Sequence, residues 1–384
     1  MRFEFATATR VLFGAGTVRE IPPAAKEMGQ RALFVTGLPQ ERSAPLISQL
    51  ELAGVTCCSF GVATEPTLDL VRQGVQFARA EQCDLVVGFG GGSAIDAGKA
   101  IAALLTNRGE LMEYLEVIGQ GKALRVPSAP FIAVPTTAGT GAEVTRNAVL
   151  AAPEHQVKVS LRSPLMLARL AVVDPELTLD LPPTITAYTG LDALTQVIEP
   201  YVCSRANPMA DGFCVEGMRR GSRSLRRAYL HGHDMEARTD MSLASLLGGL
   251  ALANAGLGVV HGFAAPLGGM FPAPHGAVCA ALLPHGMEVN IRALRARAPE
   301  SESLRHYEEV ARLLTGRPNA TPEDGVEWVR AICQELNISR LSSYGIREAD
   351  VPVLVEKASR ASSMKGNPIV LTPDELDEVL TRAL

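Results

Sequence analysis

The sequence predicts an α/β N-terminal half built on a mainly parallel β-sheet, followed by an all-helical C-terminal half. Two observations support this fold class. Up to about residue 180, short apolar runs alternate with amphipathic helical stretches, and after Asp174-Pro175 the patterns are helical, interrupted by Gly and Pro. Because strands that alternate with helices form βαβ units, the first half should form a parallel sheet. We therefore expect two domains, at residues 1–180 and 181–384.

The expected strands are runs of four to six residues rich in β-branched or aromatic types, at 32–36, 55–60, 84–89, 131–134 and 170–173. Helices are expected between them, for example at 68–81 and 95–105. The α/β pattern ends at Leu181-Pro182-Pro183, and a helix-start signal there begins the second half. Its helical patterns cover residues 186–201, 208–230, 234–255, 277–292, 301–314 and 322–336, and a last helix starts at Pro373.

Composition narrows the class of protein. The 384 residues are 47% hydrophobic and 20% charged, with a net charge of -5, which is typical of a globular chain and gives no basic footprint for nucleic acid. The longest apolar runs fall short of the roughly 20 residues that a bilayer span needs, and the N-terminus does not resemble a signal peptide. The seven cysteines form no Cys-x-x-Cys pair and are expected to be buried, reduced thiols. These features predict a cytoplasmic protein without membrane or nucleic-acid partners.

A glycine-rich turn follows the expected strand at 84–89 and opens a helix. It reads Phe89-Gly-Gly-Gly-Ser-Ala-Ile-Asp96. Glycines let the backbone approach a diphosphate, and a helix N-terminus offers free N–H donors. The pattern is not Gly-x-Gly-x-x-Gly, because Ser93 stands where the last glycine should be. The turn also follows about the third strand rather than the first. We expect a phosphate site on a variant scaffold, with a plain strand-to-helix turn as the alternative.

A second polar turn, Pro135-Thr-Thr-Ala-Gly-Thr-Gly-Ala-Glu143, ends the expected strand at 131–134. Open α/β sheets bind ligands outside the carboxyl ends of their strands. The hydroxyls of this turn could therefore line the same crevice as the glycine turn. A capped turn without a ligand is the competing interpretation.

An acid and two histidines are candidate metal ligands in the second half. Asp192 and Gln196 are four residues apart on an expected helix, so they share one face. His261 and His275 each lie in an apolar, Gly/Pro-rich segment. Carboxylate oxygen and neutral imidazole nitrogen are ligands of divalent transition metals. The spacing alone is a weak signal, because each histidine, like His285, could instead be a satisfied core residue.

Together these segments resemble the iron-containing (group III) alcohol dehydrogenase family over nearly the whole chain. The matching motifs are Phe13-Gly-Ala-Gly16, Gly90-Gly-Gly-Ser-Ala-Ile-Asp96, the Pro135–Glu143 turn, Val173-Asp-Pro-Glu176, Gly190-Leu-Asp-Ala-Leu194 with Glu199, His261-Gly262, and His275-Gly-Ala-Val278 with Leu283-Pro-His-Gly286. The resemblance implies a Rossmann-like dinucleotide-binding domain followed by an all-helical metal and substrate domain, an architecture like that of dehydroquinate synthase.

The resemblance also implies NAD or NADP in a cleft between the domains. The cofactor contacts that it implies are Gly91, Gly92 and Ser93 at the diphosphate, Asp96 beside the nicotinamide, Thr136, Thr137 and Thr140 at the adenine side and diphosphate, and Asn147 and Lys158 at the ribose hydroxyls. The family's acid for the ribose 2′-hydroxyl is replaced by Gly37, and Arg42 follows five residues later. A missing acid and a nearby cation would tolerate a 2′-phosphate, so NADP should be usable.

The family's metal position, an Asp and three histidines, maps onto Asp192, Gln196, His261 and His275, for iron or zinc. Two residues depart from the family pattern. Gln196 stands where the family has His, and an amide oxygen is a poorer ligand than imidazole. Ala265 stands where the family usually has a His beside the nicotinamide, and Ala cannot relay a proton.

The expected activity is reversible hydride transfer between nicotinamide and a small alcohol or aldehyde, in a homodimer. A metal held by Asp192, His261 and His275, with Gln196 as a weak fourth ligand, would stabilise the alkoxide, which makes these three residues catalytic. The alternatives are a metal-independent NAD(P)H-dependent reductase on the same fold, a dehydroquinate-synthase-like lyase that uses NAD without net redox, and a non-catalytic nucleotide-binding protein.

Overall fold

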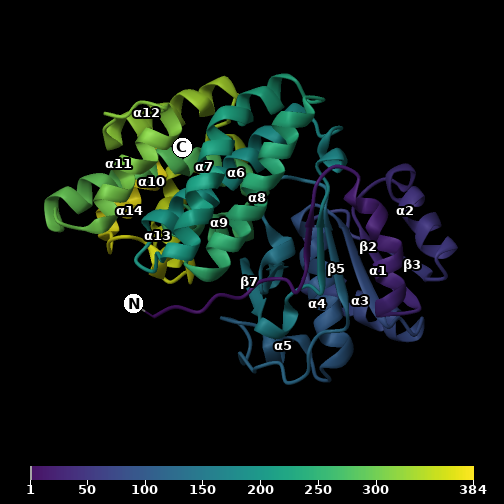
Figure 1. Cartoon of the computed structure of the whole chain (residues 1–384). Coiled ribbons are helices and arrows are strands. Elements are labelled where there is room, and N and C mark those ends of the chain that lie inside the picture. Colours follow the sequence, from purple (N-terminus) through teal and green to yellow (C-terminus); the bar gives the residue numbers. More distant parts are fainter. Residues whose placement is uncertain (1) are drawn as a thin grey trace. The chain divides into compact units, whose positions relative to one another are not determined.

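The computed structural model describes residues 2–384, which form two compact units (Figure 1). One unit holds the β-sheet and comprises Ala6–Thr137 and Gly141–Thr178. The other is helical and comprises Leu179–Leu384 with residues 2–5 and Ala138–Thr140. The predicted fold class, a parallel α/β part followed by an all-helical part, is confirmed.

The sheet has six strands, all parallel, in the order β1-β8-β5-β4-β2-β3. They are β1 (Val11–Phe13), β2 (Arg31–Thr36), β3 (Thr56–Gly61), β4 (Leu85–Gly90), β5 (Phe131–Pro135) and β8 (Leu170–Val173). The expected strands are all present, and their ends agree with the prediction to within one residue. The edge strand β1 was not predicted, because three apolar residues are too short a run to show a period.

Helices cover both faces of this sheet. They are α1 (Ile21–Met28), α2 (Gln40–Leu52), α3 (Leu68–Ala80) and α4 (Gly92–Thr106). Phe34 and Val87 point to one face and join buried residues of α1 and α2 in an apolar cluster. On the other face, the ring of Phe131 lies against Gly88 of the sheet and Gly98 of α4. Because both faces are covered, the central strands are apolar without alternation, as in other parallel sheets.

A small antiparallel hairpin completes the sheet unit. Its strands, β6 (Asn147–Ala152) and β7 (Val157–Arg162), form a separate sheet and were not predicted. The Asp96 carboxylate on α4 accepts a hydrogen bond from the Val149 N–H at 3.1 Å. The Lys99 ammonium, also on α4, donates to the Asn147 carbonyl at 2.7 Å. Helix α4 therefore anchors the hairpin.

The helical unit packs around one continuous apolar cluster. Its long helices are α6 (Pro183–Val202), α7 (Pro208–Leu230), α8 (Met235–Asn254), α9 (Val259–Met270), α10 (His275–Arg297), α11 (Glu302–Thr315) and α12 (Pro322–Glu335), and the shorter α13 (Val351–Ser359) and α14 (Pro373–Thr381) follow. Asn207 and Asp234 cap α7 and α8 by accepting backbone N–H bonds, as side chains of these types do at helix starts. Helices α9 and α13 were not predicted; Gly and Pro inside α9 resemble a loop in the sequence.

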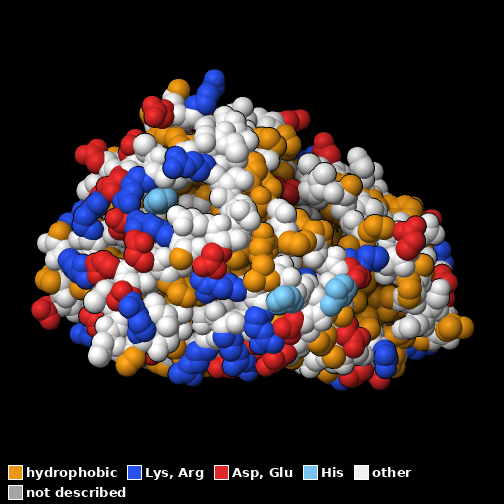
Figure 2. All heavy atoms as spheres, turned by 90° about the horizontal axis from the view of Figure 1, so that it is seen from above, with side chains coloured by type: hydrophobic (Ala, Val, Ile, Leu, Met, Phe, Trp, Pro, Cys, Tyr) orange, Lys and Arg blue, Asp and Glu red, His pale blue; other side chains and the backbone are white. Residues whose placement is uncertain are grey.

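The surface carries charges of both signs. On the face drawn in Figure 2, basic and acidic side chains are interspersed. The helical unit also carries ion pairs near its surface, such as Arg297–Glu375 at 2.9 Å, and pairs of this kind contribute little to stability. Within residues 2–384, no single helix is long and apolar enough to cross a membrane, although α8 and α9 taken together pass that test while being bent by 97°.

Candidate cofactor turns and metal cluster

The glycine turn and the start of the threonine turn lie side by side at the carboxyl edge of the sheet. Strands β4 and β5 are neighbours, and the Thr136 N–H donates to the Gly90 carbonyl at 2.9 Å. A Cβ added to Gly91 would lie 3.4 Å from the Thr137 methyl group. The Thr136 hydroxyl is buried and has no hydrogen-bond partner. An unpartnered hydroxyl beside a helix N-terminus is an arrangement suited to an anionic ligand.

Gly91, Gly92 and Ser93 stand at the N-terminus of α4, where Gly91 is the N-cap residue and offers no side-chain cap. The first N–H groups of a helix have no partner inside the helix, and the dipole there is positive. The turn therefore offers donors to a diphosphate. Thr140 belongs to the Ala138–Thr140 segment, which groups with the helical unit rather than with Thr136 and Thr137.

The residues expected at the nicotinamide and ribose lie on α4 and on the hairpin that it anchors. Asp96 lies between the Val149 N–H and Lys99, whose ammonium is 3.8 Å from its carboxylate. The Lys158 ammonium on β7 is 2.6 Å from the Glu65 carboxylate, and the Lys158 side chain is 5% exposed. The Lys158 ammonium is therefore already paired with Glu65. A ribose hydroxyl bound there would share this ammonium with Glu65.

Two buried charged residues of the sheet unit were missed by the sequence analysis. Lys99 donates to the Ala142 and Asn147 carbonyls and to the Thr145 hydroxyl, and burial lowers its pKa to about 8. Burial raises the pKa of Glu143 to about 7. Lys99 follows Asp96 by one helical turn, which was the available signal. Its acceptors on the threonine turn and the hairpin are long-range contacts that no local pattern shows.

The structure gives a different reason for Gly37 from the one expected. Gly37 follows β2, and a Cβ at this position would lie 2.4 Å from the Val62 carbonyl oxygen. A side chain is therefore excluded by the neighbouring backbone. Arg42 donates to the Leu177 carbonyl at 2.9 Å, so its guanidinium already has one partner.

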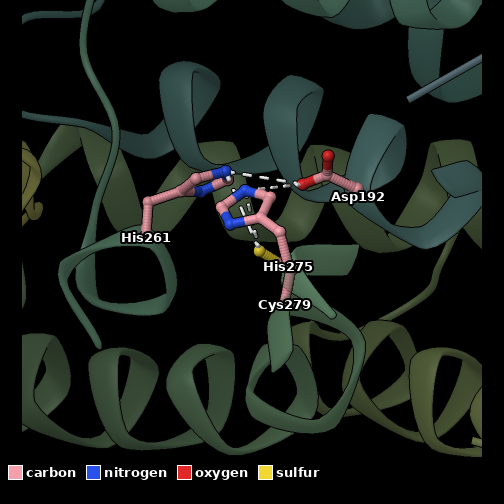
Figure 3. A group of neighbouring side chains, drawn as sticks. All are labelled: Asp192, His261, His275 and Cys279. Atoms are coloured by element: carbon pink, nitrogen blue, oxygen red, sulfur yellow. Dashed lines mark hydrogen bonds and ion pairs between the residues drawn. The ribbon is translucent and has the colours of Figure 1, made fainter. Parts of the chain in front are cut away.

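The metal candidates of the helical unit converge from three helices (Figure 3). The His261 Nε2 and His275 Nε2 atoms lie 3.5 and 3.6 Å from the same oxygen of Asp192, Oδ1. The donor atoms of Asp192, His261, His275 and Cys279 all lie within 4.8 Å of one another. Asp192 is 2% exposed, whereas the His275 side chain is 35% exposed. The cluster is thus buried on the Asp192 side and open on the His275 side.

Two oxygens near this cluster lack hydrogen-bond partners. Asp192 Oδ1 and Gln196 Oε1 are both buried and accept no hydrogen bond, and the two imidazole nitrogens lie 3.5 and 3.6 Å from Asp192 Oδ1. The Gln196 amide nitrogen donates to the Gly139 carbonyl at 3.0 Å. Because a carbonyl can only accept a hydrogen bond, it is the nitrogen that faces Gly139, and the amide oxygen points away from Gly139. Buried polar atoms without partners are costly, and a bound cation would satisfy them. The donors present therefore fit a divalent metal.

Glu199 orients the His261 ring through its Nδ1 atom. Its carboxylate accepts from His261 Nδ1 and from the Val260 N–H, both at 2.7 Å. A proton held on Nδ1 leaves Nε2 directed at Asp192, as is usual for metal-binding histidines. Burial lowers the pKa of His261, but Cys279, Asp192 and Glu199 outweigh burial and raise that pKa well above its ordinary value.

The same balance operates at the partner residues of His261. Burial raises the pKa of Asp192, but His275 and His261 outweigh burial and lower that pKa. Burial lowers the pKa of His275, and Cys279 and Asp192 outweigh burial and raise it. The negative charge of Asp192 and positive charge at the imidazole nitrogens therefore favour each other.

Cys279 was missed by the sequence analysis, and His285 takes no part in the cluster. Cys279 Sγ lies 3.9 Å from His261 Nε2 and 3.7 Å from His275 Nε2. The sequence feature that could have revealed Cys279 was its position four residues after His275. Burial lowers the pKa of His285 to about 4, so His285 is a neutral residue near Arg382 and Arg330. All seven cysteines are free thiols, but four of them are only half-buried, which differs from the buried set expected.

Comparison with known proteins agrees with these features. A family model described as iron-containing alcohol dehydrogenase matches residues 8–175, and one described as the C-terminal part of the Fe-containing alcohol dehydrogenase family matches residues 186–384. The chain is 35% identical over 379 residues to alcohol dehydrogenase 4 of Schizosaccharomyces pombe, covering 97% of this chain and 87% of that protein.

Solved structures show the same likeness. A 1,3-propanediol oxidoreductase matches with a TM-score of 0.92 and 32% identity, covering 100% of both chains. A sulfoacetaldehyde reductase from Bifidobacterium kashiwanohense, solved with NAD+, matches with a TM-score of 0.86 and 28% identity, covering 99% of this chain and 98% of that one. The chain therefore belongs to the iron-containing alcohol dehydrogenase family, NAD(H)- and divalent-metal-dependent oxidoreductases that act on CH–OH groups.

Proposed function

We propose that the chain transfers hydride reversibly between C4 of a nicotinamide and the carbon of a small alcohol or aldehyde, with a divalent metal at Asp192, His261 and His275 and with Gln196 as a weak fourth ligand. The observation that carries the proposal is the convergence of two imidazole nitrogens on one otherwise unpartnered oxygen of Asp192. A divalent cation bound there would polarise the C–O bond of the substrate and acidify the alcohol.

The protein's own residues have separate tasks in this proposal. Asp192 supplies negative charge that offsets part of a dication's charge. Glu199 holds the proton of His261 on Nδ1 and keeps Nε2 free to ligate. His275, the most exposed donor of the three, marks the side from which substrate arrives. Ala265 carries no titratable group, so the alcohol proton would leave through solvent on that side.

We propose that the cofactor is held by the turns of residues 1–180, and that residues 181–384 supply the metal and substrate site. The proposed contacts keep the expected roles: Gly91, Gly92 and Ser93 at the diphosphate, Thr136, Thr137 and Thr140 at the adenine side and diphosphate, Asp96 at the nicotinamide, and Asn147 and Lys158 at the ribose. The free donors of α4 and the unpartnered Thr136 hydroxyl support this assignment.

We propose that NADPH binds at least as well as NADH, because Gly37 presents no acid to a 2′-phosphate. A Gly37→Asp variant is a poor test, since its Cβ would strike the Val62 carbonyl. Calorimetry of the wild type with each dinucleotide tests the proposal directly. A strong preference for NADH would place the specificity determinant elsewhere.

We also propose that the protein is a cytoplasmic homodimer that acts on a small molecule and has no nucleic-acid or membrane partner. Light scattering coupled to size-exclusion chromatography checks the assembly, and a monomer at micromolar concentration would contradict it.

The central experiment removes and restores the metal. The enzyme is stripped with a chelator, supplied with zinc, iron(II) or manganese, and assayed with primary alcohols and aldehydes. We expect activity to fall on stripping and to return on addition. His275→Ala should abolish the recovery, and Gln196→His should tighten binding, because imidazole is the better ligand. Full activity after exhaustive stripping, with Gln196→His no different from wild type, would favour the metal-independent reductase.

A further inference from the structure

The Cys279 thiol lies among the donor atoms of the metal cluster. Zinc bonds of about 2.0 Å to nitrogen or oxygen and about 2.3 Å to sulfur, at tetrahedral angles, separate sulfur from nitrogen by roughly 3.6 Å and nitrogen from oxygen by roughly 3.3 Å. The observed sulfur–nitrogen distances are 3.7 and 3.9 Å. The observed nitrogen–oxygen distances are 3.5 and 3.6 Å. These four of the six donor pairs lie within a few tenths of an ångström of a tetrahedral zinc shell, and the other two lie within 4.8 Å.

The local fold explains why the thiol points into the cluster. His275 begins α10 and Cys279 lies four residues later, so both side chains leave the same face of the helix. Figure 3 shows the sulfur beside both imidazoles. Cys279 is fully buried, with 0% of its surface exposed. The thiol therefore faces the cluster and is shielded from solvent.

Gln196 competes poorly for the fourth position. Its amide nitrogen is committed to the Gly139 carbonyl, and its oxygen is neutral. A thiolate is charged and is among the ligands that zinc binds most tightly, whereas an amide oxygen suits harder cations. The chain thus carries a weak donor at position 196 and a stronger one at position 279.

We propose that Cys279, in place of Gln196, is the fourth protein ligand of the metal, as a thiolate, and that the site therefore selects zinc over iron(II). This inference rests on the proposed function in assuming that Asp192, His261 and His275 bind a metal. Formation of the zinc–sulfur bond releases the thiol proton to solvent and needs neither oxidant nor reductant. Zinc can expand to five ligands, so a four-residue shell still admits a substrate oxygen.

X-ray absorption of the full-length, zinc-loaded protein tests the ligand directly. We expect one sulfur scatterer at about 2.3 Å besides nitrogen and oxygen at about 2.0 Å. Cobalt(II) loading should give a sulfur-to-metal charge-transfer band in the near ultraviolet. Both signals should disappear in Cys279→Ser, and zinc affinity should fall roughly 100-fold or more, because the loss of groups one step further from a metal already costs about 10–100-fold.

Cys333→Ser is the matched control. Cys333 is a half-buried thiol of the same unit that donates to the Ala280 carbonyl, a bond that serine can keep, and it lies outside the cluster. Its variant should retain both sulfur signals and the wild-type zinc affinity. Because the wild-type spectra need no variant, a failure of Cys279→Ser to fold leaves the test intact.

The outcomes separate this inference from the proposed function. Stoichiometric zinc with only nitrogen and oxygen scatterers would overturn the role of Cys279, while zinc-dependent activity would leave the proposed function standing. Iron(II) bound more tightly than zinc would overturn the selectivity. A protein that binds neither metal would overturn both the inference and the metal-assisted reaction.

Discussion

Replacing Glu199 by glutamine should weaken metal binding without altering any metal ligand. The Glu199 carboxylate receives two hydrogen bonds of 2.7 Å, from His261 Nδ1 and the Val260 N–H. A glutamine oxygen can satisfy one of these donors, and the amide nitrogen then faces the other. If the oxygen keeps Val260, His261 must move its proton to Nε2, the atom that lies 3.5 Å from Asp192. The nitrogen that should ligate would then carry a hydrogen.

The expected magnitude follows from these two bonds. A hydrogen bond to a charged group contributes about 1.5–3 kcal/mol and a neutral one about 0.5–1.5 kcal/mol, so the exchange costs roughly 1–2 kcal/mol. Since about 1.4 kcal/mol is a factor of ten, zinc affinity should fall roughly tenfold or more. The range of about 10–100-fold observed when metal-binding histidines lose such partners is consistent with this estimate.

The assay is competition for zinc against a chromophoric chelator, with thermal unfolding measured on the metal-free proteins. Asp240→Asn is the control, because Asp240 is equally buried in the same unit and accepts from Arg220, Arg223 and Ser224. This control should unfold at a lower temperature and bind zinc normally. A Glu199→Gln variant that binds zinc as tightly as wild type, or an Asp240→Asn variant that loses as much affinity, would refute this role of Glu199.

Further predictions concern glycines and a buried acid. Gly91→Val should lower dinucleotide affinity at least about tenfold in a folded protein, because a branched side chain would fill the proposed diphosphate position; unchanged affinity by calorimetry would place that site elsewhere. Burial raises the pKa of Glu143 from 4.5 to about 7, so the folded state binds the extra proton and stability falls as pH rises across that window. Glu143→Gln should remove a slope of the order of 3 kcal/mol in total, and equal slopes in urea unfolding of both proteins would contradict this. Gly276→Ala puts a Cβ 2.4 Å from the Tyr188 carbonyl oxygen, so α10 must shift next to His275. We expect a loss of roughly 1–3 kcal/mol together with weaker zinc binding, whereas Gly212→Ala, with no atom near its Cβ, should show neither effect.

The central sheet could be predicted because its strands are buried on both faces. Five short apolar runs bounded by glycines and helices left little choice of structure. The hairpin at Asn147–Arg162 was missed because it is a small two-stranded sheet, and its position depends on hydrogen bonds to α4. Such contacts join segments some fifty residues apart and leave no local period.

Cys279 shows how a small error at a helix end conceals a site. The expected helix began at residue 277, which left His275 outside it. The actual helix α10 begins at His275, directly after Pro274, so His275 and Cys279 lie one turn apart. Helix ends are the least certain part of such a prediction. Here the error of two residues in the start of the helix concealed that His275 and Cys279 share one face.

Asp192, His261 and the pair on α10 come from three helices that are distant in sequence. A metal ion shared by α6, α9 and α10 would therefore act as a removable cross-link. Closing a long loop in this way contributes roughly 3–5 kcal/mol when the closure is covalent. Chelation should then shorten the lifetime of the folded enzyme as well as slow its reaction. Metal supply would govern how long the protein survives in addition to how fast it works.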